Sequence, residues 1–155
     1  MQWKSLETVN LILGFQNLLF AVMYWPFMGS NYHRLLIIIP ATASFFMHLS
    51  ERKHDLPGIS PFNRHAKLSL NIDRAFAAVG IGYYLFYMTH HTLSFEWYFD
   101  IIVALVFLGL SELVKPRKWF SIDNTAIHFE SLWHLVTHTV WHFQAYKLIY
   151  IILSA

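Results

Sequence analysis

Long apolar stretches separated by short polar segments dominate this sequence. As α-helices, most of them are long enough to cross a hydrocarbon core of about 30 Å. We predict helices over 8–28, 35–50, 71–89, 96–114 and 127–153. The pattern therefore predicts an all-α integral membrane protein, with one domain over residues 1–155 built as a bundle of about five transmembrane helices.

The composition supports this interpretation. Of the 155 residues, 56% are hydrophobic and 13% are charged, whereas a soluble domain carries about 25% charged residues. The absence of cysteine excludes disulfides and thiolate metal sites. No basic run or glycine-rich loop indicates binding of nucleic acid or nucleotides. Ten histidines are the unusual feature of the composition.

The basic residues are distributed unevenly around the predicted helices. Five spans place the N-terminus and the loops 51–70 and 115–124 on one side of the membrane. Cytoplasmic segments carry an excess of Lys and Arg, so we expect a multi-pass protein with a cytoplasmic N-terminus and an extracytoplasmic C-terminus. Nine of the eleven basic residues lie on that side: Lys4, Arg52, Lys53, Arg64, Lys67, Arg74, Lys115, Arg117 and Lys118.

The last predicted helix carries a polar stripe. Glu130, His134, His138 and His142 recur at every fourth position, and residues four apart share one face of an α-helix. Ionisable groups inside a membrane span are costly and face a protein interior or a water-filled cavity. We therefore expect the stripe to face polar groups of other helices.

Two other predicted helices bring polar residues to the same membrane side. Ser44 and His48 lie near the cytoplasmic end of the second helix, and Asp73 lies in the first turn of the third. Three imidazoles with one open position are the ligand set of a catalytic zinc, which lowers the pKa of its bound water to about 7. We predict His48, His134 and His138 as zinc ligands.

We predict catalytic roles for the two polar residues of these helices that are not ligands, Asp73 and Ser44. Asp73 is expected to orient or deprotonate the zinc-bound water, and Ser44 to hydrogen-bond that water or an oxyanion. Holding a histidine tautomer is an alternative role for Asp73.

Three further residues are ranked second as ligands. Glu130 belongs to the polar stripe, and His142 would lie about 12 Å deeper than His134 at ~1.5 Å per residue. His54 repeats the Ser-x-x-x-His spacing after Ser50, but it falls in or next to the polar loop. Depth therefore favours His134 and His138 as the ligands of the last helix.

The order of these motifs resembles the CREST superfamily, which includes the alkaline ceramidases, the adiponectin and progestin receptors and the haemolysin III proteins. The resemblance lies in Ser44-x-x-x-His48, the downstream Asp73, and His134-x-x-x-His138. It implies zinc bound by three histidines and, in members of known activity, hydrolysis of lipid amides. Members usually have seven spans, and this chain has five predicted ones. Losing two spans between the third and the last preserves the direction of the last helix.

These observations favour a zinc-dependent membrane hydrolase that acts on amide or ester bonds of a membrane lipid at the cytoplasmic leaflet. One alternative is a non-catalytic, family-like receptor or structural protein. Another is a haem-binding bundle, with His48 and a histidine of the last helix as axial ligands. A di-iron lipid oxidase is a further alternative. The pattern makes no prediction of the oligomeric state.

Overall fold

Five long α-helices form the part of the chain that the structure describes. A computed structural model describes residues 2–50, 58–92, 94–113 and 129–154. The helices are α1 (Gln2–Tyr24), α2 (Asn31–Ser50), α3 (Ala66–His90), α4 (Phe95–Leu113) and α5 (Phe129–Ser154), with single 3-10 turns η1 (Trp25–Phe27) and η3 (Phe62–His65). The predicted all-α fold of five helices is confirmed.

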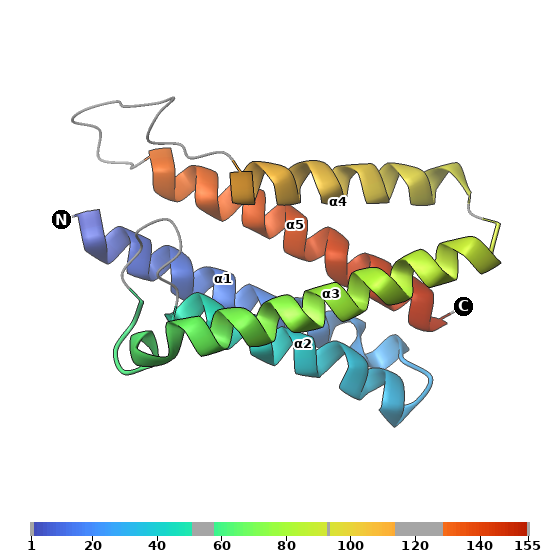
Figure 1. Cartoon of the computed structure of the whole chain (residues 1–155), viewed down its shortest axis with the longest axis horizontal. Coiled ribbons are helices and arrows are strands. Elements are labelled where there is room, and N and C mark those ends of the chain that lie inside the picture. The colour runs from blue at the N-terminus through green and yellow to red at the C-terminus, as the bar shows by residue number, and fades with distance from the viewer. Residues whose placement is uncertain (1, 51–57, 93, 114–128, 155) are drawn as a thin grey trace.

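Successive helices run in alternating directions, so α1, α3 and α5 point one way and α2 and α4 the other (Figure 1). α1 packs against both α2 and α5, α4 packs along α5, and α3 lies mainly on α2. None of the 25 residues of α3 is buried. The interior of the bundle is therefore formed mainly by α1, α2 and α5.

The parallel helices α1 and α5 are in contact at two points along their length. Thr139 Oγ1 donates a hydrogen bond of 2.9 Å to Gln16 Oε1. Two turns further along, Tyr24 stacks on Tyr150 with ring centroids 4.9 Å apart. The sequence separations of these two pairs differ by only three residues, so the two helices stay side by side over this length.

α1 and α2 approach each other closely at Gly14. A Cβ atom on Gly14 would lie 3.2 Å from Cδ2 of Phe45, and the Phe45 ring also meets Phe15 edge-on at 5.3 Å. Small residues at helix crossings allow such close approach. This contact fixes the height of α2 against α1, and with it the position of His48 one turn further on.

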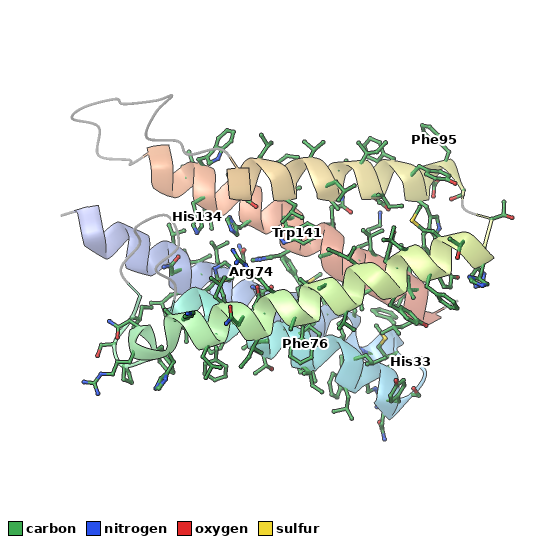
Figure 2. All side chains as sticks on the ribbon, in the orientation of Figure 1. His33, Arg74, Phe76, Phe95, His134 and Trp141 are labelled. Carbon is green, nitrogen blue, oxygen red and sulfur yellow. The ribbon has the colours of Figure 1, made fainter. Side chains whose placement is uncertain are left out.

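Several polar residues are buried beside the apolar core, and many large apolar residues are exposed. Phe15, Leu19 and Phe95 are each more than half exposed, and apolar side chains cover the outer faces of the helices in Figure 2. A soluble domain shows the opposite preference. The buried polar residues are Asn10, Asn17, Ser44, His48, Ser50, Asp100, Ser111, His134, Thr137, His138 and His142.

Among the described residues, one helix is long and apolar enough to cross a membrane, judged by its length and composition. It is the segment Val9–Phe27 near the N-terminus. A signal sequence or the core helix of a soluble protein has the same properties, so the multi-pass bundle is not shown and stays a prediction. α4 and α5 are interrupted by charged residues and histidines, among them Asp100, His142 and Lys147.

α3 begins earlier than predicted. It starts at Ala66 rather than at residue 71, directly after η3, and its first turn holds no acidic residue. Asp73 is therefore the eighth residue of the helix, and the expectation that it lies in the first turn is wrong. The reason is that residues 58–65, expected as loop, are already ordered against α2, where the N–H of Ile59 donates to the Leu49 carbonyl at 2.7 Å.

An ion pair joins α4 to α5. Lys147 Nζ lies 2.6 Å from Asp100 Oδ2, and the side chains are 37% and 8% exposed, respectively. Removing one partner of a buried pair costs about 3–5 kcal/mol, which we discount to about 2 kcal/mol because Lys147 is partly solvated. We expect Lys147→Met to lower the Tm of the purified protein by about 4–8 °C.

The matched control removes both charges. In the double variant Lys147→Met, Asp100→Leu no carboxylate is left unpaired, so we expect the Tm to return close to that of the wild type. A Tm of the single variant equal to that of the wild type would show that the ion pair contributes nothing to the packing of α4 on α5.

Candidate metal centre

Four buried histidines meet between α2 and α5. His48 lies near the C-terminal end of α2, and His134, His138 and His142 lie on α5. The ring centroids of the three α5 histidines are 5.0 to 6.5 Å from that of His48. Figure 2 shows the labelled His134 on the inward side of α5. The structure thus brings together the three histidines that the sequence predicted as ligands.

His142 is the nearest of the three to His48. Their Nε2 atoms are 3.3 Å apart and their ring centroids 5.0 Å apart. The argument that ranked His142 lower because of its depth is therefore wrong in its geometry. His48 lies two residues before the end of α2, whereas His142 lies thirteen residues after the start of α5.

The distance between the His48 and His142 nitrogens suits two kinds of contact. Two ligands of a tetrahedral zinc, each at about 2.0–2.1 Å, are separated by about 3.3 Å. The same separation also allows an N–H···N hydrogen bond between two neutral imidazoles. The pair can therefore hold a metal ion or a proton.

Ring spacing suggests which third histidine would complete a site. Imidazoles on one tetrahedral zinc have centroids about 5.2 Å apart. The centroids of His48, His138 and His142 are 5.0, 5.5 and 5.8 Å apart. Those involving His134 are uneven, 4.1 Å to His138 and 6.5 Å to His48. The spacing favours His138 over His134 as the third ligand.

The donor atoms do not form a complete three-ligand site as they stand. Among the residues that the structure describes, no group of three His, Asp or Glu side chains is arranged to hold a metal ion. His138 has the second contact that ligands usually make: its Nδ1 donates to the His134 carbonyl oxygen at 3.1 Å. The imidazole donors and the spacing of the His48 and His142 nitrogens fit zinc. A third ligand would require another histidine side chain to turn toward them.

Of the two residues predicted to act in catalysis, Ser44 lies on the same helix as His48 and Asp73 lies on α3. Ser44 is buried one turn before His48 on the same helix. Asp73 is half-buried on α3, and its carboxylate lies within electrostatic range of the Tyr146 hydroxyl, one turn beyond His142. Of the second-ranked ligands other than His142, Glu130 belongs to the first turn of α5 and His54 lies outside the described residues.

Two buried asparagines on α1 were missed by the sequence interpretation. Asn17 Nδ2 lies 2.9 Å from the Leu13 carbonyl oxygen and 3.4 Å from Nδ1 of His142. Asn10 is fully buried two turns earlier, and its side-chain atoms have no hydrogen-bond partner within the described part of the chain. Their spacing of seven residues puts both on one face of a helix, a signal that could have placed α1 beside the histidines.

Comparison of the chain with known protein families, with curated proteins and with solved structures finds no match. The resemblance to the CREST superfamily therefore depends on the motif residues alone. All five motif residues lie in the part of the chain that the structure describes: Ser44, His48, Asp73, His134 and His138.

Proposed function

We propose that this protein is a membrane-embedded, zinc-dependent hydrolase of lipid amide or ester bonds, with its metal held by the buried histidines of α2 and α5. The observation that carries the proposal is the 3.3 Å separation of the His48 and His142 Nε2 atoms. The ring of His138 stands beside them at the spacing of a third ligand.

The chemistry of the donors supports zinc over the alternatives. Neutral imidazole suits zinc, copper, iron and nickel, and three imidazoles with an open position are typical of catalytic zinc. The His48 and His142 nitrogens, 3.3 Å apart, have the spacing of two ligands of a tetrahedral zinc.

The membrane location is supported by the inverted distribution of polarity. Many Phe and Leu side chains are exposed, whereas four histidines and Asp100 are buried. In water this outer surface would be a very large apolar patch, whereas in a bilayer it is the favourable outer face. Buried polar groups inside membrane bundles also mark functional sites.

The residues around the histidines have the groups that hydrolysis needs. A bound zinc would supply a water of lowered pKa and polarise a carbonyl oxygen. The Ser44 hydroxyl, buried beside His48, would donate a hydrogen bond to the developing oxyanion. The Asp73 carboxylate would accept the proton of the attacking water. The burial of the histidines excludes bulk solvent and strengthens these interactions.

A second candidate is a protein that binds the metal without turnover, as a receptor or structural protein. The observation that favours it is the position of Asp73, the eighth residue of α3, on a helix that carries none of the four clustered histidines. A carboxylate held away from the metal could not take the proton of the water.

Metal analysis of the purified protein tests the proposal. We expect the chain to stay in the membrane fraction after an alkaline carbonate wash, and to carry zinc in about a one-to-one ratio after purification in detergent without chelators. The sample should show no haem absorption band and no stoichiometric iron. Release of the chain by the carbonate wash would refute the membrane location, and zinc at background level after dialysis against micromolar zinc would refute the metal site.

A further inference from the structure

We propose that Asn17 sets the tautomer of His142 and thereby decides whether the His48–His142 pair holds a proton or a metal ion. The inference deepens the proposed function, on which its metal-binding part rests. Its tautomer part concerns the metal-free protein and stands independently.

The Asn17 amide is fixed in one orientation. The side chain is 1% exposed, and its Nδ2 lies 2.9 Å from the carbonyl oxygen of Leu13, one turn earlier in α1. A carbonyl oxygen only accepts hydrogen bonds, so the amide nitrogen and not its oxygen must face Leu13. The Oδ1 atom has no hydrogen-bond partner among the described residues.

This orientation determines which nitrogen of His142 is protonated. Asn17 Nδ2, a donor, lies 3.4 Å from His142 Nδ1, so that Nδ1 must accept. A neutral imidazole that accepts at Nδ1 carries its proton on Nε2. The Nε2–H of His142 then donates to Nε2 of His48 at 3.3 Å. The contacts form one directed chain from Asn17 through His142 to His48.

The same chain opposes a metal ion at the pair. Zinc needs a lone pair on His142 Nε2, so the proton on that atom must be lost or must move to Nδ1. A proton on His142 Nδ1 would face the N–H group of Asn17, and two donors cannot hydrogen-bond to each other. The metal-bound state therefore requires Asn17 to turn its Oδ1 toward Nδ1, which breaks the hydrogen bond to Leu13. Asn17 is a positioning residue, acting on the metal through His142.

A carboxylate at position 17 would reverse this preference. Metal-ligating histidines usually donate their second N–H to a carboxylate, carbonyl or water, and changes in such partners alter metal affinity by about 10–100-fold. We expect Asn17→Asp to stabilise the Nδ1–H form of His142 and to tighten zinc binding by about tenfold. Asn17→Leu keeps a similar volume and removes both preferences, so we expect a mixture of tautomers.

The experiment uses the full chain labelled with ¹⁵N-histidine in detergent micelles. Long-range ¹H–¹⁵N correlation spectra at pH 8.5 distinguish the two tautomers of each imidazole, and the loss of one set of signals in His142→Phe assigns His142. The expected results are the Nε2–H tautomer in the metal-free wild type and the Nδ1–H tautomer in Asn17→Asp. Zinc titration of the same samples gives the affinities.

Gln16→Leu is the matched control. It removes the neighbouring hydrogen bond between α1 and α5, from Thr139 to Gln16, and should change neither the tautomer of His142 nor the affinity for zinc. The Nδ1–H tautomer in the metal-free wild type would overturn the inference, as would an Asn17→Asp variant that folds and keeps both wild-type properties. Absence of zinc binding in the wild type would overturn the proposed function and the metal part of this inference, and the tautomer of the wild type would still decide the role of Asn17.

Discussion

His48→Ala and His142→Ala should each lower the affinity for zinc by more than about 100-fold, because each removes one of the two nitrogens already at ligand distance. Zinc content per chain after purification, measured by mass spectrometry, is the readout. Helical content by circular dichroism, compared with that of the wild type, shows whether each variant is folded.

The same assay separates the two candidate ligand sets. The ring spacings predict that His138→Ala loses most of its zinc and that His134→Ala keeps it. The assignment made from the sequence, with His48, His134 and His138 as ligands, predicts instead that His134→Ala loses zinc and His142→Ala is milder. Retention of full zinc content by His142→Ala would rule out the set with His48, His138 and His142.

Asp73→Asn should retain zinc while the rate of lipid hydrolysis falls by about 10²–10⁴-fold, the usual cost of losing a general base. Asparagine has nearly the same size as aspartate but cannot take a proton from water. The assay follows fatty-acid release from ceramide-like and phospholipid substrates in micelles, with the zinc content measured on the same samples. A variant that hydrolyses as fast as the wild type would exclude Asp73 as the base.

Ser44→Ala should show the same separation of binding from turnover, with a fall of about 10²–10³-fold from the loss of one oxyanion donor. Thr42→Val is the control, since it removes a hydroxyl two residues away on α2 whose donor bond goes to the Ile38 carbonyl. It should leave the rate unchanged. If the wild type binds zinc yet hydrolyses none of these lipids, the non-catalytic function replaces the hydrolase.

The helices could be predicted because their signal is local. Each apolar stretch is bounded by polar residues or by Pro and Gly, and the observed ends of α2 and α4 lie within a few residues of the predicted ones. The start of α3 was predicted five residues too late. Ala66 to Leu70 alternate between apolar and polar residues, so hydropathy gave no sign that the helix had already begun.

The relative heights of the helices could not be predicted in the same way. The prediction matched the depth of His134, near the start of α5, to that of His48, near the end of α2, and so placed His142 about 12 Å deeper than both. The contact of Gly14 with Phe45 and the hydrogen bond from Thr139 to Gln16 set the true heights. These are packing contacts between residues that lie far apart in sequence, and no periodicity within one helix encodes them.

The pairing of α1 and α2 with α5 has a consequence for when the histidine cluster can form. Asn17 and His142 are 125 residues apart, and His48 and His142 are 94 residues apart. While the ribosome is still making α3 and α4, the histidine of α2 has none of its three imidazole neighbours. The nascent chain must hold Asn10, Asn17 and His48 without them until α5 arrives. Under the proposed function, zinc bound at the cluster would mark chains whose last helix has docked, and metal content would then measure completed assembly.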